Sequence, residues 1–259
     1  MRYFVIFFST FLAHLFNFSN VAKFGIDISF EVFYIIVQLY YNIERREDML
    51  IPDGRKKILE VFLKNPFEEI HLREIARMSK ASLTNVDNSM KLFVKNDMFK
   101  KREMSHSTFF KPNFENDDLI KVFELLELER RKEFYLKNKN ISRLLKKYAE
   151  TTVELSNKRI QMIILFGSVA RGEWTKSSDI DILAVVADKE DDIIDILNKA
   201  KTDARPLLEI RPISTTVKKF TEGLRVKAEF YENLWKDRII LYNEFLFWQL
   251  IKEGGKKNA

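Results

Sequence analysis

The alternation of apolar and polar positions predicts two structured blocks in this chain. In the first, residues 53–114, apolar side chains recur at helical spacing and are followed by a segment that alternates as paired strands do. Asn65-Pro66 ends the first helix, and Ser82 is a good cap for a later one. The expected elements are a helix over 56–63, a strand over 70–72, helices over 73–78 and 82–96, and a hairpin over 99–112.

The second block begins with two apolar helical stripes, separated at Asn138-Lys139-Asn140, which predict a helical connector over residues 117–156. We interpret the charge run Glu127 to Lys132 as a solvated helix face. The later elements expected are strands over 162–166, 179–186, 207–213 and 238–242, and helices over 193–201, 226–235 and 244–252. Four aromatic residues near the end are predicted to be core: Trp235, Phe245, Phe247 and Trp248.

Residues 1–48 differ in composition from the rest, because nine of the 23 Phe lie in the first 40 residues. The apolar run Tyr3 to Phe18 is shorter than the roughly 20 residues that a spanning helix needs, and His14 interrupts it. Three interpretations are open: a membrane anchor, a partner-binding helical extension, or an upstream reading frame attached to a true start at Met49. We favour the last, because the composition changes abruptly at residues 44–48, and we therefore expect a dispensable segment and no membrane partner.

Composition narrows the possible functions. The net charge of +6 and the pI near 9.2 favour anionic partners. The chain has no Cys, which excludes disulfides, thiolate zinc sites and cysteine nucleophiles. Its three His are far apart in the sequence, so a His-based metal site is not expected. These features suit a cytoplasmic protein.

Candidate chemistry is concentrated between Ile163 and Val186. A buried strand is broken by Gly167-Ser168, where Gly permits a tight turn and Ser favours the start of a helix. Side chains at i and i+2 of a strand share a face, so Asp179 and Asp181 are expected to project together. Paired carboxylates suit a hard divalent ion, and backbone N–H groups at the turn suit a phosphate. These are the requirements of phosphoryl or nucleotidyl transfer.

The order Gly-Ser-x-Ala-Arg-Gly followed by Ser-Asp-Ile-Asp resembles the signature of the polymerase-beta-type nucleotidyltransferase superfamily, in particular its minimal nucleotidyltransferase branch. The resemblance implies that Gly167 and Ser168 hold a nucleoside triphosphate, with ATP expected. It also implies that Asp179 and Asp181 bind Mg²⁺ or Mn²⁺. Members of this branch occur beside helical HEPN-type toxins, which makes a protein acceptor attractive.

Several nearby residues have roles that the sequence leaves open. Glu209, on the strand expected over 207–213, is similar to the superfamily's third carboxylate and third metal ligand, although that residue is more often Asp. Arg211 shares its face, and either holds a phosphate or neutralises Glu209 and weakens a second metal. Arg171 either contacts a phosphate of the nucleotide or braces the loop. The acidic residues Asp188 to Asp192 suit a helix N-terminus, and we give them no metal role.

The order of elements expected over residues 53–112 resembles winged helix-turn-helix domains, whose second motif helix lies in the major groove of duplex DNA. Asp87 and Asp97 dilute the basic character of this face, so a protein-interaction or packing module is the alternative. The side chains available to phosphates or base edges are Lys80, Ser82, Thr84, Asn85, Asn88 and Lys91, together with Lys100, Lys101 and Arg102 on the hairpin.

We therefore predict an α+β protein. A winged helix-turn-helix domain (49–116) and a helical connector (117–156) precede a nucleotidyltransferase-fold α/β domain with a small mixed sheet (157–259). The expected activity is metal-dependent transfer of a nucleoside monophosphate from a nucleoside triphosphate to an unidentified hydroxyl acceptor. The alternative is a DNA-binding transcriptional regulator or antitoxin-like protein whose nucleotidyltransferase fold senses nucleotide without turnover. The intact Asp-x-Asp favours chemistry, whereas the doubtful third carboxylate favours sensing.

Overall fold

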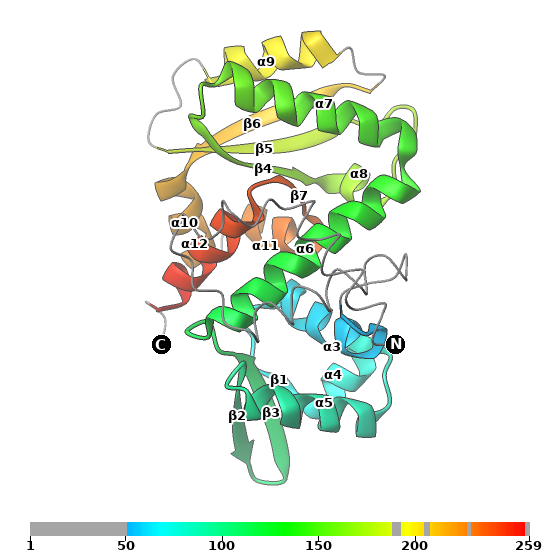
Figure 1. Ribbon diagram of the computed structural model, residues 1–259, viewed down its shortest axis with the longest axis vertical. Helices are drawn as coiled ribbons and strands as arrows, with labels where there is room; N and C mark the ends of the chain where they lie inside the picture. The colour runs from blue at the N-terminus through cyan, green and yellow to red at the C-terminus, as the bar shows by residue number, and fades with distance from the viewer. Residues whose placement is uncertain (1–50, 188–192, 205–207, 227–228, 257–259) are drawn as a thin grey trace, which may run out of the picture. The chain divides into compact units, whose positions relative to one another are not determined.

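The structure, a computed structural model, describes residues 51–187, 193–204, 208–226 and 229–256 (Figure 1). The interpretations of residues 1–48 and of Asp188 to Asp192 therefore lie outside the described residues. Residues Ile51–Ala259 form one compact unit. Within the part of it that is described, no helix is long and apolar enough to cross a membrane.

The first elements of this unit follow the predicted order. They are α3 (Asp53–Lys64), β1 (Ile70–His71), α4 (Leu72–Ser79), α5 (Leu83–Lys95), β2 (Phe99–Met104) and β3 (Ser107–Pro112). β3 pairs antiparallel with both β1 and β2, which gives a three-stranded sheet in the order β1-β3-β2. The expected helices, short strand and hairpin are all present, and their ends differ from the prediction by three residues or fewer.

Local hydrogen bonds explain where the first helices begin and end. The Ser82 hydroxyl accepts a hydrogen bond from the Asn85 N–H at 3.3 Å and caps α5, as predicted. His71 Nδ1 accepts one from the Arg73 N–H at 3.2 Å and caps α4 in the same way. Lys80 then ends α4 in the left-handed conformation, with φ 54°. The chain is thereby turned between α4 and α5.

The predicted connector consists of α6 (Asp117–Lys137) and α7 (Lys139–Leu155), with the expected break at Asn138. The prediction of a solvated charge run on α6 is wrong. Glu127 is fully buried and pairs with the fully buried Arg238, while Glu129 lies 3.4 Å from Lys56 Nζ. These partners come from elements far away in the sequence, so the local charge pattern could not reveal them.

The second sheet has four strands in the order β6-β5-β4-β7. The strands are β4 (Ile160–Phe166), β5 (Ile180–Val186), β6 (Ile210–Thr216) and β7 (Ile239–Tyr242). β5 and β6 are parallel, whereas β4 pairs antiparallel with β5 and β7, so the sheet is mixed, as predicted. β6 starts three residues later than the expected strand over 207–213, and Leu208, ahead of the strand, packs against a hydrophobic core.

Helices cover both faces of this sheet (Figure 1). α7 and α9 (Ile193–Ala204) lie on one face and, with Ile180 and Ile182 of β5, form what we call the α7–α9 core. α10 (Val217–Arg225), α11 (Glu229–Asp237) and α12 (Glu244–Lys256) lie on the other face, next to Leu183 and Val185. Alternate residues of β5 therefore face different cores.

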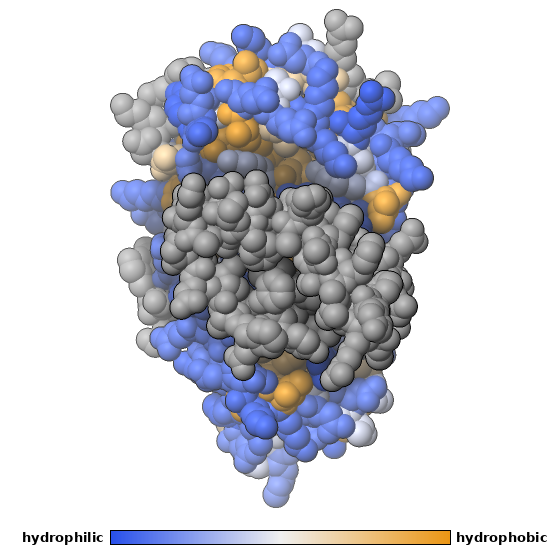
Figure 2. All heavy atoms as spheres, in the orientation of Figure 1, coloured by the Kyte–Doolittle hydropathy of each residue, from blue (hydrophilic) through white to orange (hydrophobic). Residues whose placement is uncertain are grey.

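The core on the α10–α12 side also contains residues of α3, α5, the hairpin and α6, and we call it the shared core. The rings of Phe123 and Trp248 lie 4.7 Å apart, and those of Phe67 and Trp235 lie 5.7 Å apart. Residues assigned from the sequence to separate domains thus pack together. In Figure 2, most of the coloured surface on the visible face is hydrophilic, with smaller apolar patches between.

Three details of the C-terminal prediction are wrong. α10 lies where no element is expected, and α11 starts at Glu229 instead of Val226. A Cβ at Gly223 would lie 2.0 Å from the Tyr231 ring, so the glycine that weakens the helical pattern is required for close packing of α10 on α11. Trp235, Phe247 and Trp248 are buried as predicted, but Phe245 is 61% exposed because it lies on the outer side of α12.

Candidate functional site

The turn between β4 and α8 (Gly167–Arg171) requires glycine. Gly167 has φ +76°, a conformation that L side chains rarely adopt. A Cβ at this position would lie only 2.4 Å from Asp181 Oδ2. The Asp181 carboxylate therefore lies directly against the backbone of the turn. The structure thus brings together one of the candidate acidic residues and the candidate phosphate-binding turn.

Asp179 lies just before β5 and Asp181 is the second residue of that strand, and both are half-buried. Because Ile180 and Ile182 face the α7–α9 core, Asp181 lies on the opposite face of the strand. Burial raises the pKa of Asp181, and the negative charge of Asp179 raises it further. The Asp179 carboxylate, which disfavours the charged form of Asp181, is therefore held close to it at one end of the sheet.

Arg211 supplies positive charge beside this pair. Its Nη1 lies 3.0 Å from Asp179 Oδ2, and it stands opposite Asp181 in the register of β5 and β6. The guanidinium opposes the rise in the pKa of Asp181. Of the two roles expected for Arg211, neutralisation of Glu209 is wrong, because Arg211 pairs with Asp179 instead.

Glu209 lies just before β6, where its carboxylate pairs with Lys201 of α9. Its backbone carbonyl accepts a hydrogen bond from the Ile180 N–H at 2.7 Å, which aligns the starts of the two strands. Among the residues that the structure describes, no group of three or more acidic, His or Cys side chains is placed to hold a metal ion. The structure therefore does not bring Glu209 together with Asp179 and Asp181.

Arg171 holds α8 to its surroundings. Its Nε donates to Glu173 Oε2 at 2.7 Å and its Nη1 to Asp237 Oδ2 at 2.9 Å, and these carboxylates raise its pKa. Ser168 is half-buried, and its carbonyl accepts a hydrogen bond from the Glu173 N–H at 3.0 Å. These contacts brace the loop, and the expected contact between Arg171 and a phosphate stays a prediction. Sequence reasoning missed Asp237, because no local signal links α11 to this loop.

The chemistry of the acidic pair fits a divalent cation. Mg²⁺ in phosphate-transfer sites is commonly held by one or two carboxylates together with phosphate oxygens. Asp179 and Asp181 supply two carboxylates, and the raised pKa of Asp181 indicates that burial and repulsion make its charge costly. A cation between the two groups would relieve that repulsion.

All nine residues that the sequence suggested for DNA contact are exposed: Lys80, Ser82, Thr84, Asn85, Asn88, Lys91, Lys100, Lys101 and Arg102. Three of the cations already have acidic partners. Lys91 lies 2.6 Å from Asp87, Lys101 pairs with Glu103, and Arg102 Nε donates to Glu69 at 2.8 Å. The positive charge of this surface is therefore weaker than the sequence suggests.

Part of this chain is similar to known proteins. A family model described as a nucleotidyltransferase domain matches residues 145–247, which include all four strands of the mixed sheet. A protein of Methanocaldococcus jannaschii, whose name proposes a protein adenylyltransferase, is 30% identical over 105 residues. Those residues cover 40% of this chain and 99% of the relative. No solved structure matches the chain.

Proposed function

The chain belongs to the nucleotidyltransferase domain family, and on that basis we propose that it transfers a nucleoside monophosphate from a nucleoside triphosphate to a hydroxyl acceptor. The observation that carries the proposal is the contact between Gly167 and Asp181. It unites a turn suited to phosphate with a carboxylate suited to a metal ion. Positioning and charge neutralisation account for most of the catalysis of such reactions.

Each residue has a proposed role. Gly167 and Ser168 bind the triphosphate, and Asp179 and Asp181 hold Mg²⁺ or Mn²⁺, which supplies charge neutralisation at the phosphates when bound. Arg211, which is exposed beside Asp179, contacts a phosphate oxygen. The acceptor oxygen forms a bond to the α-phosphorus, the bond from that phosphorus to the bridging oxygen of the β-phosphate breaks, pyrophosphate leaves, and the hydroxyl proton passes to solvent water.

The proposed donor is ATP and the proposed acceptor is a protein hydroxyl. The name of the M. jannaschii relative supports both choices, and the match covers nearly the whole length of that relative. A HEPN-type toxin is one protein that fits this role, because Ser, Thr and Tyr side chains supply suitable hydroxyl groups.

Labelling tests the transfer directly. The full chain is incubated with ATP labelled at the α-phosphate, Mg²⁺ and a cell lysate, and the expected result is a labelled protein. The Asp179→Asn/Asp181→Asn variant keeps side-chain size but loses the charge that holds the metal ion, so labelling should be abolished. Asp118→Asn, on an exposed part of α6, is the matched control. Undiminished labelling by the folded double variant would contradict the assignment.

A second candidate function is suggested by Glu209. Its ion pair with Lys201 leaves two carboxylates near the turn, which supports a fold that binds nucleotide without transferring it. The protein would then be a DNA-binding regulator or antitoxin-like protein. Calorimetric binding of ATP and Mg²⁺ with no label on any protein, including a neighbouring toxin, supports this alternative.

We further propose domain limits of 49–116, 117–156 and 157–259, with the first domain a winged helix-turn-helix that binds duplex DNA. The order of elements, the sheet order β1-β3-β2 and the exposure of α5 support this assignment. α5 would lie in the major groove and the β2–β3 hairpin would form the wing.

Salt dependence tests the DNA proposal. The logarithm of affinity should fall with the logarithm of salt concentration, by about 0.9 per phosphate contact. Within the described residues, Lys80 and Lys100 have no ion-pair partner, whereas Arg102 pairs with Glu69. Lys80→Ala and Lys100→Ala should therefore weaken binding to every sequence more than Arg102→Ala does. Absence of salt-dependent binding by the full chain at low ionic strength would exclude direct DNA binding.

A further inference from the structure

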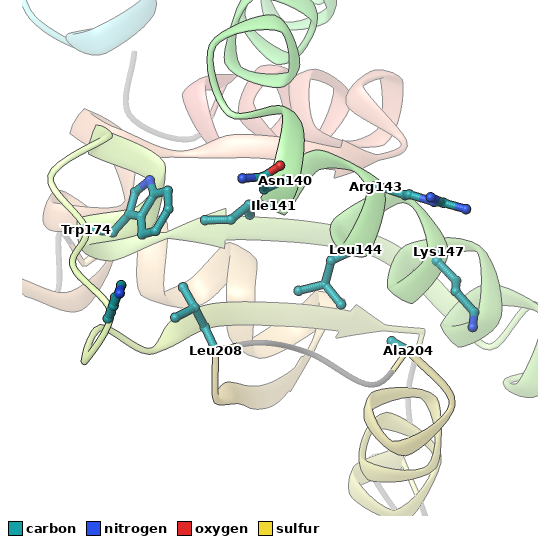
Figure 3. Close-up of a pocket in the computed structure, with 9 residues that line it drawn as sticks. Asn140, Ile141, Arg143, Leu144, Lys147, Trp174, Ala204 and Leu208 are labelled. Atoms are coloured by element: carbon teal, nitrogen blue, oxygen red, sulfur yellow. The ribbon is translucent and has the colours of Figure 1, made fainter.

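A cavity of about 680 Å³ opens on the side of the mixed sheet that lies away from the acidic pair (Figure 3). Its apolar floor is formed by Ile141 and Leu144 of α7, Ala204 of α9 and Leu208, which all belong to the α7–α9 core or pack against it. Asp181, in contrast, shares its strand face with residues of the shared core. The sheet therefore separates this cavity from the proposed transfer site.

One wall of the cavity is the half-buried indole of Trp174, in the loop between α8 and β5. The Trp174 Nε1–H donates to Asn138 Oδ1 at 3.2 Å, which fixes the ring and satisfies its polar atom. Figure 3 shows the indole on one side of the cavity and Arg143 and Lys147 on the other. A fixed indole offers a surface on which a planar ring can stack.

Three basic residues, Arg143, Lys147 and Lys176, line the cavity, and none of its described lining residues is acidic. Lys147 Nζ donates to the carbonyl of Asp203 at 2.8 Å. Arg143 and Lys176 have neither a hydrogen bond nor an ion pair with any described residue. Positive charge that no described lining residue compensates, around an apolar recess, favours a ligand that is anionic at one end and apolar at the other.

We propose that this cavity binds a nucleoside monophosphate, at a site distinct from the transfer site. The base stacks on Trp174, and the phosphate lies near the cations that line the cavity, of which Arg143 and Lys147 lie on the side opposite the indole. The cavity volume falls within the range of about 300–1,000 Å³ that small-molecule sites occupy. A phosphate without a ring would leave the indole and the apolar floor unused, and a neutral apolar ligand would leave the cations unused.

A short segment of the chain connects this cavity to the acidic pair. Trp174 and Lys176 flank Thr175, whose N–H donates to Ser178 Oγ at 2.8 Å in a tight turn. That turn leads straight to Asp179. A nucleotide held by Trp174 and Lys176 therefore contacts the segment that positions the first carboxylate of the transfer site.

Titration of AMP into the full chain, in EDTA to remove divalent ions, tests the proposal. Calorimetry should detect binding, and fluorescence should report it through Trp174, because Trp235 and Trp248 are 8% and 0% exposed. Trp174→Ala should weaken binding by about 5- to 150-fold, since stacking contributes roughly 1–3 kcal/mol per base. Trp174→Phe keeps a ring, so calorimetric binding should persist while the fluorescence change is lost.

Charge variants test whether the cations that line the cavity bind the phosphate of AMP. Arg143→Gln/Lys176→Gln should weaken AMP binding roughly tenfold, because each exposed charge contributes up to about 1 kcal/mol, and should leave adenosine binding unchanged. Lys146→Gln is the matched control, because Lys146 is on the same helix and lies over Tyr135 instead. The Asp179→Asn/Asp181→Asn variant should bind AMP normally, whether or not the proposed transferase activity exists.

Three results would overturn the proposal. These are no AMP binding at millimolar concentration, parental affinity in both the Trp174→Ala and the Arg143→Gln/Lys176→Gln variants, or loss of AMP binding in the double Asn variant. If Trp174→Ala does not fold, the AMP affinity of the Arg143→Gln/Lys176→Gln variant tests the proposal instead, because that variant changes only exposed side chains.

Discussion

At the scale of single residues, two glycines with nearly the same backbone conformation have different surroundings. Gly167 and Gly172 have φ +76° and +78°, but only at Gly167 would a Cβ meet another group, the Asp181 carboxylate. Their alanine variants therefore share the backbone strain, of order 1 kcal/mol, and differ in the displacement of Asp181.

Gly167→Ala should lower the rate of label transfer about a hundredfold, since a displacement near 1 Å at a catalytic group can have that effect. Gly172→Ala should lower the melting temperature about as much as Gly167→Ala does, yet keep the transfer activity. The measurements are the labelling assay and thermal unfolding of both variants. Equal loss of activity in the two would show that the contact with Asp181 is unimportant.

The pKa of Asp181 is a second test at this scale. Burial and Asp179 raise it, and Arg211 lowers it. Asp179→Asn should therefore lower the pKa of Asp181, and Arg211→Gln should raise it further. Because the folded-state pKa lies above its unfolded value, the fold should gain stability as the pH falls through the raised pKa. Carbon-13 NMR titration of the Asp181 carboxyl group measures the shifts, and opposite signs would contradict this electrostatic account.

Sequence reasoning predicted the residues whose placement depends on local geometry. It missed the ion-pair partners that come from neighbouring strands and helices. Gly167, Asp179 and Asp181 follow from a turn and from alternation along one strand. The partner of Arg211 depends on the register between β5 and β6, which no local pattern specifies. Glu209 likewise pairs with Lys201, a residue whose position is set by the packing of α9.

At the scale of elements, the buried pair of Glu127 and Arg238 ties α6 to the segment after α11. Burial lowers the pKa of Arg238 to about 10, and the charge of Glu127 opposes that change. The guanidinium also donates to the Leu63 carbonyl of α3 at 3.1 Å and lies 4.7 Å from the Phe247 ring centroid. The pair therefore connects three helices and the start of β7.

Glu127→Gln should lower the free energy of unfolding by about 3–5 kcal/mol, because it leaves a buried guanidinium without its counter-charge. Glu127→Gln/Arg238→Met removes both charges and should recover much of that loss. Denaturant titration measures the three proteins. Breaking the exposed Asp118–Lys121 pair by Asp118→Asn should have no measurable effect. A mild effect of Glu127→Gln would mean that α6 does not depend on the pair.

Periodicity predicted most elements well, because an element with one buried face repeats its apolar residues at the period of its own geometry. It failed at α10, where Gly223 is required by the Tyr231 ring, and at the charge run of α6. In both places a contact between elements, which no local pattern contains, determined the residue type.

At the scale of the whole molecule, the shared core predicts that residues 51–259 unfold as one unit. Phe62→Ala, in the first helix, should lower the free energy of unfolding by about 3–5 kcal/mol. It should shift the transition seen by the buried Trp235 and Trp248 as much as that seen by amide exchange in α5. Separate transitions for the two probes would contradict a common core.

The shared core also has a consequence for synthesis on the ribosome. α3 is made before Trp248 and Ile251, which belong to the same core. Apolar faces of α3, α5 and α6 therefore lack part of their covering until α12 has been translated. Nascent chains of this protein should bind ribosome-associated chaperones until α12 leaves the exit tunnel. Premature termination before Glu244 should yield aggregating products instead of a free N-terminal domain.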